Sequence, residues 1–244
     1  MRTMHEQDTI TALDRDMDAL LTRIMTMGGL VEHAITEAAQ ALGARDEERA
    51  EAVIAADARI DALEAAVQAD VVALLARHQP AGSDLRAAIV ALKMAADFER
   101  IADYAKNLSK RVRVLSRAPV IDGAGAAIRR LARAVQGLLR DALDGHVRGD
   151  AALLQDVLGR DVEVDQMTAA LFRQFLTHMM EDPRNITPCM HYLFIVRNLE
   201  RMGDHVTEIC EQAIHLHTGH RPGARPKGPS TAHLTVLPGD GGGR

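Results

Sequence analysis

Aromatic residues are scarce in this sequence, which has no tryptophan, two tyrosines and four phenylalanines among 244 residues. Alanine and leucine fill the apolar positions instead, and hydrophobic residues, at 47%, are numerous enough to form a core. Small and straight-chain side chains favour helices, whereas aromatic and β-branched side chains favour strands. The composition therefore predicts an all-α protein whose helices pack closely on one another.

Cysteine is scarcer still. The sequence contains only Cys189 and Cys210, and they are not in CxxC spacing. This argues against a disulfide scaffold and against a zinc site built from thiolates. Both cysteines are expected to be small apolar packing residues.

Long apolar runs and an excess of positive charge are also missing. No stretch approaches the roughly 20 apolar residues that a membrane span needs. Residues 1–9 are polar and lack the apolar segment of a signal peptide. The net charge is −5, so the chain has no basic surface typical of a nucleic-acid-binding protein. We therefore expect a cytoplasmic protein that binds no nucleic acid.

Glycine and proline cluster at a few positions and leave long segments with helical periodicity between them. Six helices are predicted, at residues 10–42, 47–77, 84–116, 125–146, 150–180 and 188–217. The predicted organisation is an N-terminal extension (1–9), a three-helix bundle (10–116), a linker (117–125), a second three-helix bundle (126–217) and a tail (218–244). The tail is expected to be disordered, because it cannot bury enough apolar surface to offset the entropy of ordering it.

The chain contains an internal repeat. An offset of 104 aligns residues 57–61 with residues 161–165, and an offset of 101 aligns residues 98–103 with residues 199–204. The difference of three residues falls in the loop before the last helix, where a change of length costs little. The sequence therefore predicts two tandem, structurally similar three-helix bundles.

Pairs of carboxylates four residues apart occupy equivalent positions in both repeats. On a helix such residues have Cβ atoms about 5–6 Å apart, and like charges there destabilise the helix by a few tenths of a kcal/mol. A cation bound between them would reverse that effect, so one metal site is predicted in each repeat. The predicted ligands are Asp57, Asp61, Glu99 and Asp103 in the first repeat and Asp161, Asp165, Glu200 and Asp204 in the second.

The helical phase of these pairs predicts where they lie. The glutamate-containing pairs fall opposite the apolar stripes of their helices, and the aspartate pairs fall at the edge of the stripe. We therefore expect surface or groove sites, with no carboxylate in the deep core. Oxygen ligands suit magnesium, manganese or iron. A solvated acidic face that binds no metal remains the alternative.

His205 directly follows Asp204 and would add a nitrogen ligand, although Tyr104 occupies the equivalent position of the first repeat. A solvent-facing histidine is the simpler interpretation. The sequence has no glycine-rich phosphate loop and no nucleophile–base pair at a recognisable spacing. The Glu-x-x-His pattern of ferritin-type oxidases is also absent from the repeat motifs. We therefore expect a protein that is not an enzyme.

Taken in order, the motifs of both repeats resemble those of the PhoU family over residues 10–217. In the first repeat they are DxxxD at 57–61, QPxxxDLR at 79–86 and FERIADYAKN at 98–107. In the second repeat they are DxxxD at 161–165 and NLERMGDH at 198–205. The sequence departs from the family pattern at Ala102, where the family has glycine, and at residues 182–188, which lack a QPxxxDLR segment.

The resemblance implies two three-helix bundles that bind multinuclear iron or zinc clusters at the acidic motifs. It also implies a negative regulator of the phosphate-starvation response and of phosphate uptake. Such a regulator couples the ATPase of a phosphate ABC transporter to a sensor histidine kinase, meets the membrane only through these partners, and forms a homodimer. The alternatives are a carboxylate-rich metal-storage bundle or oxidase, and a structural helical scaffold without metal.

Overall fold

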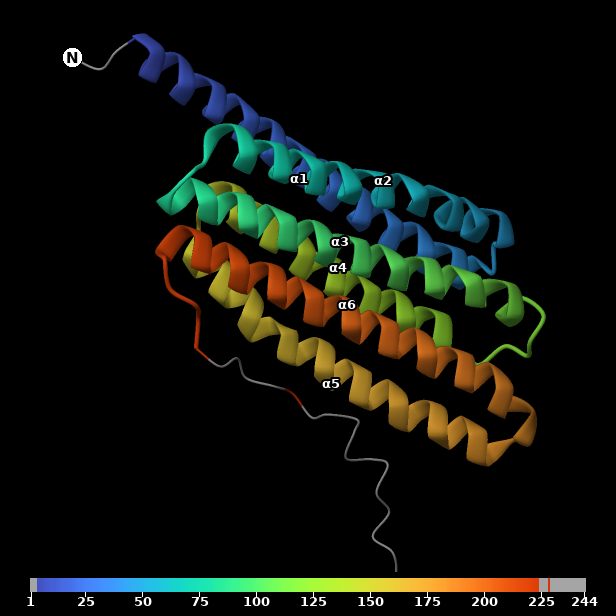
Figure 1. Cartoon of the computed structure of the whole chain (residues 1–244). Coiled ribbons are helices and arrows are strands. Elements are labelled where there is room, and N and C mark those ends of the chain that lie inside the picture. Colours follow the sequence, from blue (N-terminus) through green and yellow to red (C-terminus); the bar gives the residue numbers. More distant parts are fainter. Residues whose placement is uncertain (1–3, 224–227, 229–244) are drawn as a thin grey trace, which may run out of the picture.

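The computed structural model describes residues 4–223 and residue 228. Within these residues the chain forms six long helices and one short 3-10 helix, and it contains no strand (Figure 1). They are α1 (Met4–Ala44), α2 (Glu47–His78), α3 (Gly82–Leu115), α4 (Ala124–Arg148), α5 (Ala151–Glu181), η1 (Pro183–Asn185) and α6 (Ile186–Thr218). The prediction of an all-α fold is confirmed.

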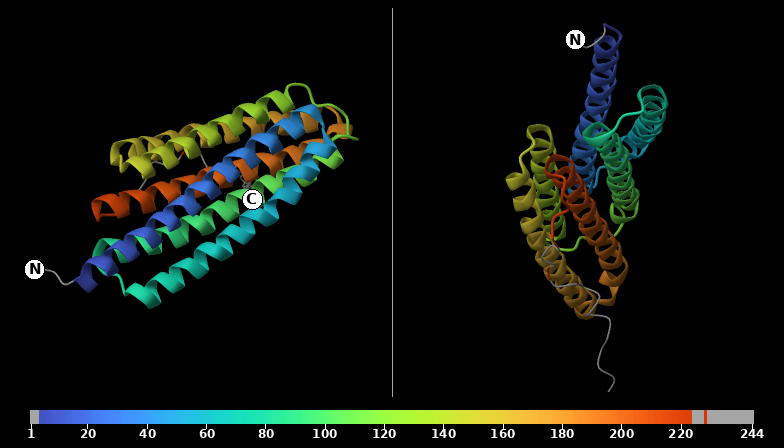
Figure 2. Two further views of the ribbon diagram at one scale, coloured as in Figure 1. Left: turned by 90° about the horizontal axis from the view of Figure 1, so that it is seen from above. Right: turned by 60° about the vertical axis from the view of Figure 1, so that its left-hand side comes forward.

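The ends of the chain differ in detail from the prediction. α1 begins at Met4, six residues before the predicted helix, and its N-terminal end extends beyond the other helices (Figure 2). The segment between Met4 and the predicted start contains no glycine or proline that would end the helix. At the other end, Thr218 is the last residue of α6. The predicted disordered tail lies outside the described residues, except for residues 218–223 and 228.

The helices of the two repeats pack side by side. In the view of Figure 1, α2, α3, α6 and α5 follow one another across the molecule, and each contacts the next. α1 packs against α2 and α3, and α4 packs against α5 and α6. The repeats meet where α3 contacts α6 and where α1 contacts α4. We call the α3–α6 contact the seam.

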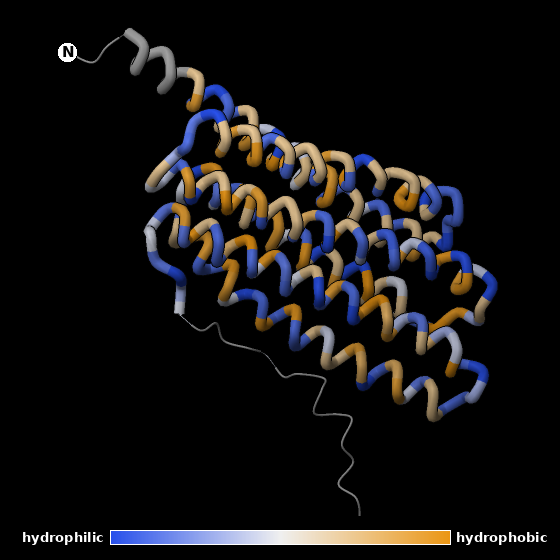
Figure 3. The backbone as a smooth tube through the Cα atoms, in the orientation of Figure 1, coloured by the Kyte–Doolittle hydropathy of each residue, from blue (hydrophilic) through white to orange (hydrophobic). Residues whose placement is uncertain are grey.

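A single hydrophobic core runs through both repeats. The predicted apolar stripes of α3 and α6 lie within it, because Ile101, Leu108, Met202 and Ile209 are all fully buried. Polar and apolar stretches alternate along each helix (Figure 3), as helices with one buried face require. Among the described residues, no helix is both long enough and apolar enough to cross a membrane.

The internal repeat extends to the turns between helices. Arg45 and Gly149, at equivalent positions, both adopt positive φ angles, of 55° and 64°. The next residues, Asp46 and Asp150, are the N-caps of α2 and α5, and their carboxylates accept hydrogen bonds from backbone N–H groups of the first turn. The same local chemistry therefore starts the second helix of each bundle.

Candidate functional site

The four predicted carboxylates of the first repeat interact electrostatically across α2 and α3, and Lys106 of α3 contacts both Asp57 and Asp103. Burial and the charges of Asp57 and Asp103 raise the pKa of Asp61. Burial and the charges of Asp103 and Asp61 raise the pKa of Glu99. The negative charges of these groups therefore oppose one another's ionisation. We call Asp57, Asp61, Glu99 and Asp103 the first cluster.

Asp57 is buried, in contrast to the prediction that no carboxylate lies in the core. Its side chain is 5% exposed, because α1 lies against α2 and covers the edge of the stripe on which Asp57 sits. The Lys106 ammonium of α3 pairs with Asp57 Oδ2 and lies 3.4 Å from Asp103 Oδ1. Asp57 Oδ1 is buried and has no hydrogen-bond donor among the described residues. One oxygen of this buried carboxylate therefore has no hydrogen bond to offset its loss of hydration.

The buried aspartate recurs in the second repeat. Asp161 of α5 is 4% exposed, so it too contradicts the prediction. It lies against α6 at Gly203, where an added Cβ would be 3.0 Å from Asp161 Oδ1. The first repeat has Ala102 at the equivalent position of α3, and this residue is also buried. The close approach of aspartate and helix explains why a small residue stands at this position in both repeats.

The other three carboxylates of the second repeat have local partners. Glu200 and Asp204 each form an ion pair with the arginine three residues earlier on α6, with N–O distances of 2.6 and 3.5 Å. Asp165 of α5 accepts a hydrogen bond from the backbone N–H of Gly228 at 2.8 Å. We call Asp161, Asp165, Glu200 and Asp204 the second cluster.

The two clusters have cations at different positions. Arg197 pairs with Glu200 in the second cluster, and Ala96 stands at the equivalent position of the first repeat. At an offset of 101, Thr207 of α6 stands where Lys106 stands on α3. Thr207 is buried, and its hydroxyl donates to the backbone oxygen of Asp204 at 2.6 Å. The first cluster thus contains an ammonium between its two helices, whereas the second cluster has a neutral side chain at that position.

The chemistry of the donor set suits a metal ion, but among the described residues only Asp97, His205 and Glu208 bring three ligand atoms within 4.8 Å of one another. The orphaned Asp57 Oδ1 and the mutual repulsion within the first cluster are features that a bound cation would relieve. All eight predicted ligands are carboxylates, which suit magnesium, manganese or iron. Zinc also accepts carboxylate oxygens as ligands, in addition to nitrogen and sulfur.

Two segments of the chain, residues 24–112 and residues 128–213, match the profile of the PhoU domain. The chain belongs to the PhoU family. Each matched segment contains one of the two clusters, so the family pattern and the geometry identify the same duplication.

Curated PhoU relatives match over most of their length. The phosphate-specific transport system accessory protein PhoU homolog of Caulobacter vibrioides is 39% identical over 205 residues, which are 84% of this chain and 89% of that protein. The protein of the same name from Rhizobium meliloti is 38% identical over 240 residues, which are 95% of this chain and 98% of that protein.

Crystal structures of PhoU proteins have the same fold. PhoU from Pseudomonas aeruginosa aligns with a TM-score of 0.82 and 34% identity, covering 85% of this chain and 99% of that one. The phosphate transport system regulatory protein PhoU from Streptococcus pneumoniae aligns with a TM-score of 0.79 and 26% identity, covering 87% of this chain and 100% of that one.

In this PhoU protein the seam holds a polar network that the sequence analysis missed. Asp97 of α3 is 7% exposed, and its two oxygens contact His205 Nδ1 and Gln212 Nε2 of α6, each at 3.0 Å. Glu208 lies 3.4 Å from the same His205 nitrogen. The hydrogen bond to Asp97 raises the pKa of His205. The interpretation of His205 as solvent-facing is wrong, since its side chain is 20% exposed and paired across the seam.

Comparison of the two repeats offers the one sequence signal for this network. At the offset of 101, Asp97 corresponds to Asn198 and Tyr104 corresponds to His205. The Tyr104 and His205 rings contact each other, with centroids 5.9 Å apart. These equivalent residues of the two repeats therefore meet each other at the seam. Unlike residues at these positions indicate that the centre of the seam is not symmetric.

Proposed function

We propose that this PhoU protein is a regulator without chemistry of its own. It represses phosphate uptake and the phosphate-starvation response by coupling the ATPase of a phosphate ABC transporter to a sensor histidine kinase. The names of its relatives support the link to phosphate: two are phosphate-specific transport system accessory proteins and one is a regulatory protein. Homodimer formation belongs to the same proposal.

One observation supports the proposal, namely that carboxylates recur at equivalent positions of the two repeats, on α2 and α3 and on α5 and α6. The first cluster lies between α2 and α3, and the second lies between α5 and α6. Charged surfaces of this kind determine which partner binds and how fast it associates, through complementary electrostatics. Surfaces that bind and release partners reversibly are also modest in area and rich in polar groups.

Metal ions belong to the proposal as structural elements of the clusters. We infer that Asp57, Asp61, Glu99 and Asp103 hold one multinuclear iron or zinc cluster, and that Asp161, Asp165, Glu200 and Asp204 hold the other. Magnesium or manganese would suit the same oxygen ligands. When bound, the ions neutralise the carboxylates and present positive charge at the clusters, where an acidic partner surface would meet it.

The regulatory proposal is tested by deleting the gene in cells that grow with ample phosphate. Phosphate-starvation genes should be expressed despite the phosphate, and supplying the intact protein should restore their repression. A double variant, Glu200→Gln with Asp204→Asn, should repress these genes poorly. A matched double variant on the exposed surface of α2, Glu48→Gln with Glu51→Gln, should behave like the wild type.

Binding to partners is tested separately with purified proteins. The wild type should bind the transporter ATPase and the cytoplasmic part of the kinase, and the Glu200/Asp204 double variant should bind them more weakly. If starvation genes stay silent in the deletion strain and neither partner binds, the regulatory proposal is wrong. Metal content together with oxygen-dependent turnover of iron would instead support the oxidase or storage alternative.

A further inference from the structure

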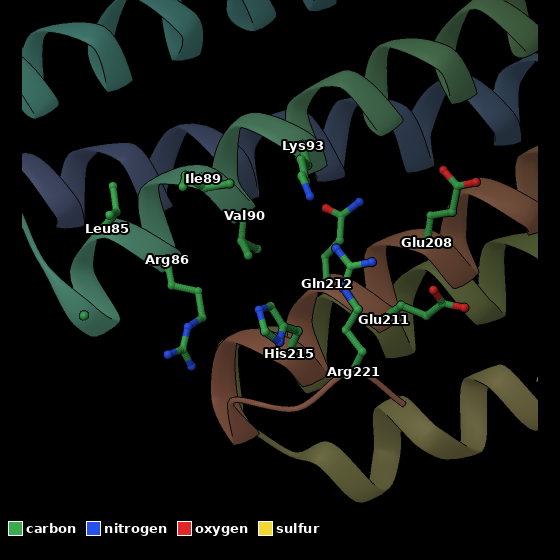
Figure 4. Close-up of a pocket in the computed structure, with 11 residues that line it drawn as sticks. Leu85, Arg86, Ile89, Val90, Lys93, Glu208, Glu211, Gln212, His215 and Arg221 are labelled. Atoms are coloured by element: carbon green, nitrogen blue, oxygen red, sulfur yellow. The ribbon is translucent and has the colours of Figure 1, made fainter. Parts of the chain in front are cut away.

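A pocket of about 380 Å³ opens at one end of the seam (Figure 4), and none of the eight cluster residues lines it. The first turns of α3 form one wall, the last turns of α6 form another, and residue 221 closes the side beyond the end of α6. Its volume falls in the range of small-molecule sites. No part of the proposed function uses this pocket.

Three cations line the pocket, namely Arg86, Lys93 and Arg221. Within the described part of the chain, none of them forms an ion pair or a hydrogen bond. The Arg86 guanidinium lies against the backbone of Gly219, since an added Cβ there would be 3.3 Å from its Nη1. Cations without partners that converge on one pocket favour a ligand of negative charge.

A histidine in the pocket wall also lacks a hydrogen-bond partner. His215 Nδ1 is buried and has no hydrogen-bond partner among the described residues. Buried polar atoms nearly always have a partner, so an unsatisfied one beside a pocket indicates that something in the pocket binds it. Figure 4 shows the His215 ring between the Arg86 and Arg221 side chains, from α6 and facing α3.

The acidic residues of the pocket stand apart from this group. Glu208 and Glu211 lie on the side of the pocket away from Arg86 (Figure 4). Glu208 contacts His205 at 3.4 Å and so belongs to the network at the centre of the seam. Outside that network, the pocket lining contains one carboxylate, Glu211, and three cations. The end of the pocket near Arg86 is therefore positively charged.

We propose that this pocket binds an oxyanion of the phosphate type. Arg86, Lys93 and Arg221 would hold its oxygens, and His215 would donate a hydrogen bond through Nδ1. Guanidinium groups recognise phosphate oxygens with pairs of parallel hydrogen bonds, which makes arginine well suited to this role. The ligand is either free orthophosphate or the phosphoryl group of a larger metabolite, whose organic part would rest on Ile89 and Val90.

The site would also tie the two repeats together. Arg86 and Lys93 belong to α3, which carries half of the first cluster, and His215 belongs to α6, which carries half of the second. A ligand that contacts both helices stabilises their packing at the seam and can alter the relative positions of the two clusters. This inference goes beyond the proposed function and does not depend on it.

The test is a titration of the full-length protein by calorimetry with inorganic phosphate, sulfate and AMP in turn, at constant ionic strength. Phosphate or AMP should bind at one site per chain. Because each arginine–phosphate contact is a charge-assisted hydrogen bond, Arg86→Gln should weaken binding about tenfold or more. Lys93→Gln should weaken it by a similar or smaller factor, and Arg86→Lys should recover part of the loss.

The matched control is Lys110→Gln, which removes one charge from an exposed position on the same helix. It should bind as the wild type does. Circular dichroism should show that all variants remain folded. The titration is repeated after treatment with a chelator, because phosphate bound to metal in the clusters would be lost with the metal, whereas phosphate in this pocket would remain.

The outcomes distinguish free phosphate from a phosphorylated metabolite as the ligand. Tighter binding of phosphate than of AMP identifies free phosphate, and the reverse identifies a phosphorylated metabolite. The proposal is overturned if no anion binds, if binding survives unchanged in Arg86→Gln and Lys93→Gln, or if the chelator abolishes it. None of these results bears on the gene-deletion test, so the two proposals can fail independently.

Discussion

At the scale of single residues, Lys106 distinguishes the two clusters. It neutralises the buried Asp57 from within the protein, whereas the second cluster has Thr207 at the equivalent position. A lysine in a metal-binding groove competes with the metal for the carboxylates. We therefore expect removal of Lys106 to strengthen divalent-cation binding at the first cluster.

The variant Lys106→Gln tests this role. It leaves Asp57 buried without a countercharge, so the metal-free protein should lose about 1–3 kcal/mol of unfolding free energy. Added manganese should restore most of the loss, because the first cluster would now accept the ion. Urea unfolding with and without manganese measures both effects. Equal stability of Lys106→Gln and wild type in a chelator would contradict the assignment, and Lys110→Gln serves as the control.

His146 predicts a pH dependence of stability. Burial, and then the nearby His217, lower its pKa from 6.5 to about 4. The folded protein therefore holds this imidazole neutral, while the unfolded chain binds a proton below pH 6.5. The stability contribution is complete above pH 6.5 and is lost as the pH falls towards 4, by up to about 3 kcal/mol.

This dependence is measured by urea unfolding between pH 7 and pH 4. The variant His146→Phe keeps a ring at the site and removes the titration, so its stability should fall less over this range than that of the wild type. His33 is exposed on α1, and His33→Gln should leave the wild-type profile unchanged. Parallel pH profiles for wild type and His146→Phe would show that the imidazole does not contribute.

At the scale of elements, α3 and α6 each contribute one face to the core, one to a carboxylate cluster and one to the seam. Their apolar stripes form the core, their acidic pairs belong to the two clusters, and Asp97 and His205 meet at the seam. One helix can do this because residues spaced by three or four share a face, while residues two apart point in different directions. Asp97 and Glu99 illustrate the point, since one is at the seam and the other is in the first cluster.

The start of α5 gives a prediction at this scale. Asp150 accepts hydrogen bonds from the N–H groups of Ala152 and Leu153 at 3.1 and 3.0 Å. Asp150→Ala removes the cap and should cost about 1 kcal/mol of unfolding free energy, whereas Asp150→Asn should cost much less. Denaturant midpoints of the two variants measure the difference. Equal midpoints would show that the cap does not stabilise the helix.

At the scale of the whole molecule, the two repeats form one cooperative structure. Their helices share a continuous core. Arg45 of the first repeat also donates hydrogen bonds to the backbone oxygens of Ala118 and Pro119, in the segment between the repeats, at 2.9 and 3.3 Å. Separating the repeats would expose the apolar surface of the seam and of the α1–α4 contact, which is unfavourable.

We therefore expect a single unfolding transition. In calorimetry the measured enthalpy should equal the van't Hoff enthalpy, as it does for one cooperative unit. The Asp150→Ala variant provides an internal check, because a change in the second repeat should lower the midpoint of the whole chain. Two resolved transitions, or a shift of only half of the signal, would show that the repeats unfold separately.

The sequence by itself determined the helices, the duplication and the acidic pairs. All three depend on local patterns: breakers between periodic segments, matched motifs at offsets of 104 and 101, and carboxylates four residues apart. Each pattern acts within one helix or is a comparison of one segment with another. The all-α fold and its duplication could therefore be predicted from residue order alone.

Only the tertiary structure decided which side chains meet across helices. The burial of Asp57 depends on α1, its pairing with Lys106 joins two helices, and the contact of Asp97 with His205 spans 108 positions of the chain. The pocket around Arg86 likewise requires the start of α3 and the end of α6 to lie side by side. Such contacts follow from the angles and offsets at which helices pack, and these are set by the fit of the whole core rather than by any local motif.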